Sequence, residues 1–117
     1  MRTALAVLIA TLLLVGCASE PPPDELMDYY WVTDLSLDDT AACLVGSMDG
    51  TYDGYTHEID DLLPGQYLEV RPQNARVMGG GDLYYVGVSR YHDGASMFLH
   101  GYGVATDAIV PAVEVCS

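Results

Sequence analysis

The sequence predicts an α+β fold in which one helix packs on a small antiparallel sheet of four to six strands. Apolar residues recur at helical spacing between Leu37 and Met48. Short runs rich in β-branched and aromatic residues follow from Tyr67 onward, separated by turn residues. The dipeptide Asp93-Gly94 between two such runs is the strongest hairpin signal in the chain. A small β-barrel or sandwich is the alternative fold.

The first predicted elements are a strand and a helix. Aromatic and β-branched side chains favour extended backbone over Tyr29–Thr33, so the folded domain should begin near residue 27. Ser36 is placed to cap the helix, with Asp39 three residues later in a capping-box arrangement. The helical face expected to pack on the sheet consists of Leu37, Ala41, Leu44, Val45 and Met48.

Short strands are predicted for the rest of the chain. They are Tyr67–Arg71, Arg76–Met78, Leu83–Tyr91, Ser96–Ala105 and Ile109–Val115. Pro111 places the last of these at an edge or a bulge, because proline cannot donate to a strand ladder.

The hairpin around Asp93-Gly94 allows a register to be written. With these two residues as the turn, the facing pairs are Tyr91 with Ser96, Ser89 with Phe98, Gly87 with His100, Tyr85 with Tyr102, and Leu83 with Val104. All of them share one face of the hairpin. The opposite face should be the core, because it carries Tyr84, Val86, Val88, Met97 and Leu99, with Gly101 and Gly103 leaving room for a helix.

The first face is a candidate binding surface. Its predicted partner-binding residues are Tyr85, Tyr91, Phe98, His100 and Tyr102, beside a dip at Gly87. Rigid amphipathic rings suit stacking on sugars or anchoring a protein partner. The alternative is that the rings only stabilise neighbouring strands, with Tyr85 and Tyr102 covering Gly87, or line the second layer of a sandwich.

The first seventeen residues have the layout of a signal peptide. One positive charge precedes an apolar run of about 13 residues, whereas a membrane-spanning helix needs roughly 20. Leu14-Val15-Gly16-Cys17 resembles the bacterial lipobox, in which a peptidase cuts before a cysteine that carries diacylglycerol. The resemblance implies lipidation of Cys17 and attachment to a membrane. A plain secretory signal is the alternative.

The resemblance also divides the chain. Residues 1–16 are the signal peptide, residues 17–26 are the lipidated cysteine with a proline-rich acidic linker, and residues 27–117 form one globular domain. The linker favours extended polyproline II backbone of about 3 Å per residue. Ala18, rather than aspartate, follows the cysteine. By resemblance to Gram-negative lipoproteins, this favours the outer membrane, facing the periplasm or the surface.

With Cys17 lipidated, Cys43 and Cys116 remain as an even pair in an oxidising compartment, so we expect them to form a disulfide. The bridge would close a loop of about 73 residues, which the chain-entropy model equates with about 4 kcal/mol of stability. A reactive or metal-binding thiol is the alternative, but neither cysteine has a lysine or arginine near it in sequence to lower its pKa.

The charge of the chain is strongly acidic, with 17 acidic residues and a formal net charge of −13. There is no lysine, and after the signal peptide the only fixed positive charges are Arg71, Arg76 and Arg90. Such a field repels nucleic acid and attracts cationic partners. Solubility or adaptation to salt explains the same composition without any partner.

One acidic loop resembles a calcium-binding loop of EF-hand type. Asp49, Asp53 and Asp60 stand at loop positions 1, 5 and 12, with Gly54 at position 6. Thr51 at position 3 and aspartate instead of glutamate at position 12 depart from that pattern. Calcium is the one cofactor the sequence raises, and a solvated acidic turn is the alternative.

These observations predict a non-catalytic, membrane-anchored module that binds a protein or a glycan, or has a structural role in the envelope, through its tyrosine-rich face. The second hypothesis is an acidic inhibitor or immunity-type protein that neutralises a cationic enzyme. The motifs of serine hydrolases, zinc proteases and nucleotide-binding loops are missing from the sequence. A small hydrolase using His100 with Asp82 or Asp107 is the third hypothesis.

Overall fold

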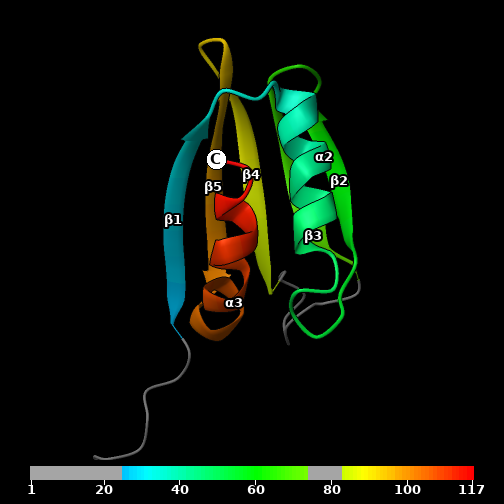
Figure 1. The fold of residues 1–117 in the computed structure, drawn as a ribbon, viewed down its shortest axis with the longest axis vertical. Coiled ribbons are helices and arrows are strands. Elements are labelled where there is room, and N and C mark those ends of the chain that lie inside the picture. Colours follow the sequence, from blue (N-terminus) through cyan, green and yellow to red (C-terminus); the bar gives the residue numbers. More distant parts are fainter. Residues whose placement is uncertain (1–24, 74–82) are drawn as a thin grey trace, which may run out of the picture.

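Five antiparallel strands form one sheet in the order β1-β5-β4-β3-β2, and two helices lie on one of its faces (Figure 1). The computed structural model describes residues 25–73 and 83–117. The elements are β1 (Leu26–Thr33), α2 (Leu37–Met48), β2 (His57–Leu63), β3 (Tyr67–Pro72), β4 (Tyr84–Tyr91), β5 (Gly94–Tyr102) and α3 (Gly103–Glu114). The α+β fold with a helix on a small antiparallel sheet is confirmed.

The hydrophobic core lies between the two helices and the sheet. The helices contribute Leu37, Ala41, Leu44, Met48, Ala105, Ile109, Ala112 and Val113, and the strands contribute Leu68, Val70, Tyr84, Val86, Val88, Ala95, Met97 and Leu99. Within β4 and β5 these are the alternate residues that the hairpin pattern assigns to the core. The even-numbered core positions of β4 and the odd-numbered ones of β5 therefore point toward the helices.

The helix α2 begins where the capping signal predicts. The Ser36 hydroxyl accepts a hydrogen bond from the backbone N–H of Asp39 at 3.1 Å, which satisfies one of the free donors at the helix start. The predicted apolar stripe is buried except for Val45, which is half-buried. Thr40 joins the buried face because its hydroxyl donates to the carbonyl of Ser36 at 2.7 Å.

The predicted strand Ile109–Val115 is wrong, because these residues belong to the helix α3 or follow it. Ala105, Ile109, Ala112 and Val113 recur at helical spacing, and all four are buried. Their burial outweighs the backbone hydrogen bond that Pro111 removes inside the helix. The predicted strand ending at Ala105 stops at Tyr102 for the same reason.

The disulfide between Cys43 and Cys116 is present, with the two Cα atoms 5.9 Å apart. Cys43 lies in α2, and Cys116 lies two residues after Glu114, the last residue of α3. The bridge therefore joins α2 to the end of α3, where a strand, Ile109–Val115, was predicted.

The strand β2 is not among the predicted strands. It carries Glu58, Asp60 and Asp61, and all of its residues after His57 are exposed, so it shows no alternation of buried and exposed positions. Its pairing with β3 shifts register between Asp60 and Leu63. The predicted strand Arg76–Met78 lies outside the described residues, as do the signal peptide and Cys17. Within the described residues, neither helix is long and apolar enough to cross a membrane.

Candidate functional site

The sheet face opposite the helices is covered by no other element among residues 25–73 and 83–117, and we call it the open face. All five residues predicted to bind a partner lie on it, on β4 and β5. The strands β1, β3 and β2 extend it on both sides. It consists of Leu26, Asp28, Tyr30, Val32, Ser96, Phe98, His100, Tyr102, Tyr85, Gly87, Ser89, Tyr91, Tyr67, Glu69, Arg71, Glu58, Asp60 and Leu63.

The hairpin register differs from the predicted one by two residues. Tyr85 faces His100, Gly87 faces Phe98, Ser89 faces Ser96 and Tyr91 faces Gly94, so the turn is His92-Asp93. A shift of two residues keeps every side chain of the hairpin strands on its predicted face, because side chains alternate with a period of two. Val104, which was expected on the same face, instead lies in α3.

Gly94 has a role different from the predicted one. It is the first residue of β5, and a Cβ atom there would lie 2.0 Å from the carbonyl oxygen of Thr33. Glycine is therefore needed for the close approach of β1, while His92 takes the positive φ of the turn, at 50°.

The predicted dip at Gly87 is filled. The ring of Tyr67 on β3 lies over Gly87, and its hydroxyl oxygen would be 2.8 Å from a Cβ atom at that glycine. Tyr67 also donates a hydrogen bond to Glu69 at 2.6 Å. Burial and this bond to a carboxylate raise the pKa of Tyr67 well above its ordinary value. The covering residue is Tyr67 from the next strand, and not Tyr85 or Tyr102.

His100 is the centre of a ring cluster on the open face. It stacks on Phe98 with 6.1 Å between ring centroids and 12° between planes, and it lies 5.6 Å from the ring of Tyr85. Its Nδ1 contacts the carboxylate of Asp28 on β1. Asp28 and Tyr30 are further functional candidates that were not predicted. The period-two alternation of side chains along Leu26–Val32 could have placed both on one face of the strand. The cluster presents aromatic surface beside a carboxylate.

The open face is acidic. It carries Asp28, Glu58, Asp60 and Glu69. Its one arginine among the described residues, Arg71, pairs with Glu69 and lies 3.8 Å from Asp60. The excess of carboxylates suits a partner with positive charge.

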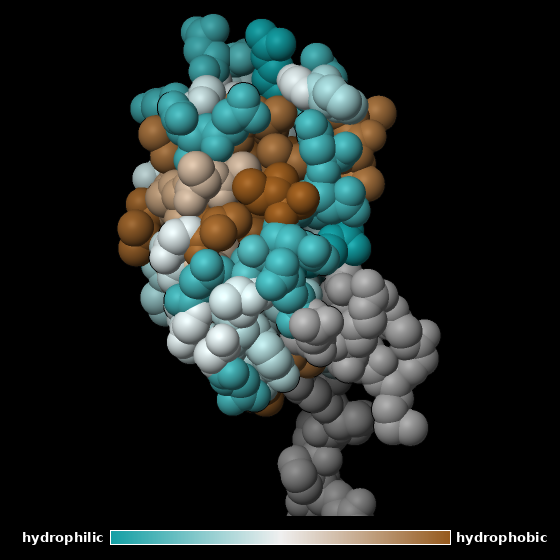
Figure 2. Space-filling model, turned by 90° about the vertical axis from the view of Figure 1, so that its right-hand side faces the viewer, coloured by the Kyte–Doolittle hydropathy of each residue, from teal (hydrophilic) through white to brown (hydrophobic). Residues whose placement is uncertain are grey.

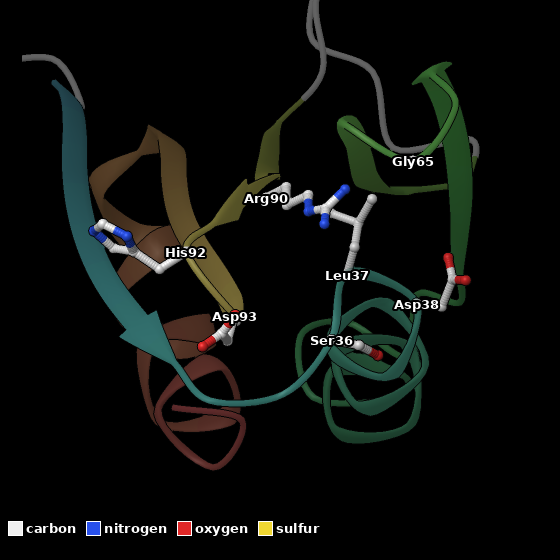
Figure 3. A pocket seen from close by; sticks show the side chains of 8 residues that line it. Ser36, Leu37, Asp38, Gly65, Arg90, His92 and Asp93 are labelled. Carbon is white, nitrogen blue, oxygen red and sulfur yellow. The ribbon is translucent and has the colours of Figure 1, made fainter.

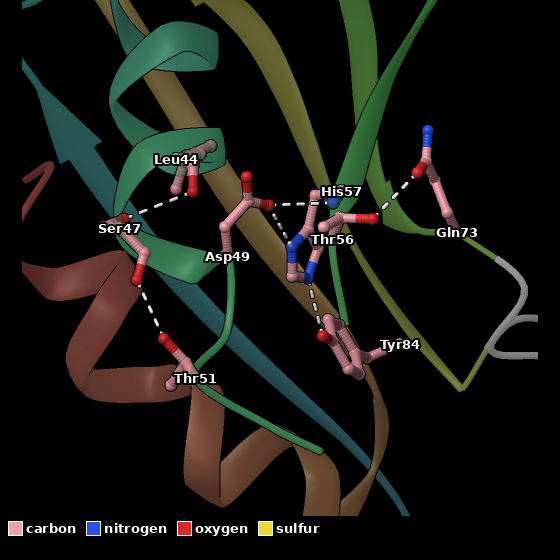
Figure 4. Close-up of polar contacts among 8 residues, drawn as sticks. All are labelled: Leu44, Ser47, Asp49, Thr51, Thr56, His57, Gln73 and Tyr84. Atoms are coloured by element: carbon pink, nitrogen blue, oxygen red, sulfur yellow. Dashed lines mark hydrogen bonds and ion pairs between the residues drawn. The ribbon is translucent and has the colours of Figure 1, made fainter. Parts of the chain in front are cut away.

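A second polar cluster lies on the helix side of the sheet, where His57 and Tyr84 are buried and the side chain of Asp49 is 40% exposed (Figure 4). Asp49 Oδ1 lies 2.9 Å from Nδ1 of His57 and accepts the backbone N–H of His57 at 2.8 Å. Nε2 of His57 lies 2.7 Å from the hydroxyl of Tyr84. Burial raises the pKa of Tyr84 well above its ordinary value. The carboxylate of Asp49 accepts from the N–H at Nδ1, which leaves Nε2 to accept from the hydroxyl of Tyr84.

The order carboxylate, imidazole and hydroxyl is also the order of a catalytic triad. Here the side chain of His57 has no exposed surface, and Tyr84 is fully buried. The ring of Tyr52 packs edge-on against Tyr84 at 6.4 Å. No substrate atom can reach the hydroxyl in this arrangement, so we interpret the cluster as a structural network that connects the end of α2 to β2 and β4.

The three aspartates of the calcium-like loop lie in different settings. Asp49 caps the end of α2 and is engaged by His57, Asp53 has a φ of 48°, and Asp60 is a residue of β2 facing Glu69. Within the described residues, no three His, Cys, Asp or Glu side chains are grouped so as to hold a metal ion. Calcium binding at this loop stays a prediction.

The histidine partners considered for a hydrolase differ from those observed. His100 contacts Asp28, whereas Asp107 accepts a hydrogen bond from the hydroxyl of Tyr29 at 3.0 Å. Asp82 lies outside the described residues.

A pocket of about 330 Å³ lies where the β4–β5 turn meets the start of α2 (Figure 3). Arg90 extends toward Leu37 there, while Asp38 and Asp93 add negative charge to the lining. The pocket combines one guanidinium with two carboxylates and so has no charge preference for an anion.

Searches of protein-family models and of curated proteins found no match to the chain.

Proposed function

We propose that the chain is a non-catalytic lipoprotein of the bacterial envelope that binds a partner through its open face. One observation carries the proposal. Both helices lie on one face of the sheet, and the other face leaves Tyr30, Tyr91 and Phe98 exposed by 60%, 44% and 37%. Core packing does not account for aromatic rings at these positions.

The shape of the open face favours an extended partner. It is the surface of a sheet, and the dip at Gly87 is filled by Tyr67. Tyrosine and phenylalanine lose little side-chain entropy on binding, and such residues are frequent energetic anchors at protein interfaces. A protein surface or a glycan chain stacked on the rings fits this arrangement, while the acidic residues give orientation.

The anchor is proposed from the lipobox at Cys17. The strand β1 begins nine residues after this cysteine, so an extended linker of about 3 Å per residue would hold the domain within roughly 27 Å of the membrane. Two or more acyl chains give stable attachment. The outer membrane is the proposed destination.

Metabolic labelling with a clickable palmitate tests the anchor. The parent chain should be labelled, and Cys17→Ser should be unlabelled. Labelling of the serine variant at the parent level would reject the assignment.

Site-specific photo-crosslinking in intact cells tests the open face. A photoreactive phenylalanine at position 30 or 98 should give adducts with another molecule. The matched control is position 104 in α3, where Val104 is 64% exposed on the helix side. Equal adduct patterns from all three positions would contradict binding through the open face.

The inhibitor hypothesis has one specific observation in its favour, which is the excess of carboxylates on the open face itself. If capture of a cationic enzyme depends on these charges, affinity should fall steeply with salt, because the Debye length is about 8 Å at physiological ionic strength. Binding that depends on ring stacking should change little over the same range. Measuring the affinity for the partner that crosslinking identifies, over a series of salt concentrations, therefore distinguishes the two functions.

A further inference from the structure

The two edges of the sheet differ in how well they resist pairing with another strand. Edge strands present unpaired N–H and C=O groups, and proteins protect them with charges, bulges and covering groups. β2 has all three kinds of protection. It carries Glu58, Asp60 and Asp61, its register shifts after Asp60, and the N–H of His57 is taken by Asp49. Figure 2 views the molecule from the side of α2 and β2, where hydrophilic residues border groups of apolar ones.

The other edge, β1, has much less protection. It pairs with β5 over eight residues without a shift, and Asp28 is its one charged residue. Gly103 N–H donates to the carbonyl of Glu25, which extends the ladder with β5 and places odd-numbered residues in the hydrogen-bonded pairs. The N–H and C=O groups of Leu26, Asp28, Tyr30 and Val32 therefore face outward. Among the described residues, no backbone group pairs with them.

We propose that two copies of the chain pair antiparallel through β1 and form a dimer with a continuous ten-stranded sheet. Side chains of the paired strands must share faces, so even-numbered residues face even-numbered ones. The register centred on Tyr29 places Leu26 opposite Val32 of the second copy and Asp28 opposite Tyr30. It uses all four outward-facing residues, and no carboxylate faces another directly.

The same operation on β2 is unfavourable. Its outward groups belong to odd-numbered residues, because Gln73 N–H donates to the carbonyl of Thr56. The register centred on Ile59 would place Glu58 opposite Asp60 twice, and like charges directly opposite are destabilising. One bare edge and one protected edge give a closed dimer instead of a growing sheet.

The dimer is compatible with the proposed anchor, and this step rests on the proposed function. In the register centred on Tyr29 the two Leu26 residues are six positions apart, or about 20 Å at 3.3 Å per residue. The nine residues back to Cys17 can span roughly 27 Å when extended, so both anchors reach one membrane. The twofold axis is normal to the sheet, so both open faces point the same way and offer a partner two adjacent sites.

Single cysteines added to the full chain, expressed with its leader in an oxidising envelope, test the pairing. Tyr29→Cys should give a disulfide-linked homodimer on a non-reducing gel, because residue 29 faces itself across the axis. Ile59→Cys on β2 should give no more disulfide-linked homodimer than the parent chain does. Stronger linking by Tyr30→Cys than by Tyr29→Cys would overturn the proposed register, and linking at the parent level from both would overturn the dimer.

Proline variants combined with Tyr29→Cys give a matched test. Tyr30→Pro removes an outward N–H of β1 and should abolish the link, whereas Ile59→Pro removes an outward N–H of β2 and should leave it intact. Unchanged linking by the Tyr30→Pro combination would overturn the proposal.

Light scattering on the detergent-solubilised parent gives a readout that needs no variant. The average mass should rise toward that of a dimer as salt is added, because screening weakens the repulsion between two chains of net charge −13. A monomer mass at every salt concentration would overturn the proposal. Photo-crosslinks from the open face to a different protein would still be observed in that case, which keeps this failure separate from a failure of the proposed function.

Discussion

The two faces of the sheet are built from alternate residues of the same strands, yet they differ in what their side chains contact. On β5, Met97 and Leu99 are fully buried under the helices, while Phe98 between them is 37% exposed. The face under the helices, which we call the covered face, contributes to stability. It forms a continuous core with the helices, which a disulfide joins to each other. The open face carries aromatic rings and carboxylates, and no other element of the described residues covers it. Residues of the covered face are therefore needed for folding, whereas residues of the open face are available to contact a partner.

The largest effect should come from the disulfide on the covered side. Replacing Cys43 and Cys116 by serine should lower the free energy of unfolding by about 4 kcal/mol, since the bridge closes a loop of 73 residues in the unfolded chain. Urea unfolding with and without reductant measures this loss. Equal stability of the reduced and oxidised proteins would show that the covered face does not depend on the bridge.

Truncations on the two faces should have unequal costs. Leu44→Ala leaves a cavity in the core and should cost about 3 kcal/mol, within the usual range of 2–5 for buried leucine. Phe98→Ala on the open face should cost roughly 1 kcal/mol or less, because part of the ring is already in water. Urea unfolding of both variants gives the two values. Equal losses would remove the distinction between the faces.

The buried hydroxyl of Tyr84 should have a smaller effect. Tyr84→Phe leaves Nε2 of His57 without its partner and should cost about 1–2 kcal/mol, the usual penalty for an unsatisfied buried group. Thermal unfolding at neutral pH measures it. A variant as stable as the parent would mean that the network with Asp49 contributes nothing.

Alkaline pH should weaken the protein through one tyrosine on each face. Burial raises the folded-state pKa of Tyr84 on the covered face and of Tyr67 on the open face, while the unfolded chain titrates near pH 10. The stability from these groups is present below about pH 10 and is lost as pH rises above it, because the unfolded state ionises first. Replacing both by phenylalanine should flatten the decline. Stability that is constant above pH 10 in the parent would contradict the assignment.

Much of the fold could be predicted where one local signal dominates. Ser36 and the apolar stripe after it predict α2, and period-two alternation predicts the faces of β4 and β5. The helix α3 was missed because Pro111 and β-branched residues favour an edge strand locally, while the burial of Ile109 and Val113 decides the outcome. The strand β2 has no alternation to detect.

The candidate site was predictable in its face but not in its details. The five aromatic and histidine positions share the open face, because a two-residue register error preserves faces. The cover of Gly87 by Tyr67 and the contact of Asp28 with His100 join strands that are distant in sequence. In the network around His57, the partner Tyr84 likewise lies on another strand, 27 residues away. Only the strand order of the sheet brings these residues together.

Cysteine accessibility, compared between intact cells and purified protein, tests whether a partner covers the open face. Phe98→Cys places a thiol on the open face, and Val104→Cys places one at a more exposed position on the helix side. A permeant maleimide should label both readily in the purified protein. In intact cells, labelling at position 98 should be several-fold slower while position 104 is unchanged, because a partner covers the open face. Equal labelling of position 98 in cells and in the purified protein would show that no partner covers the open face.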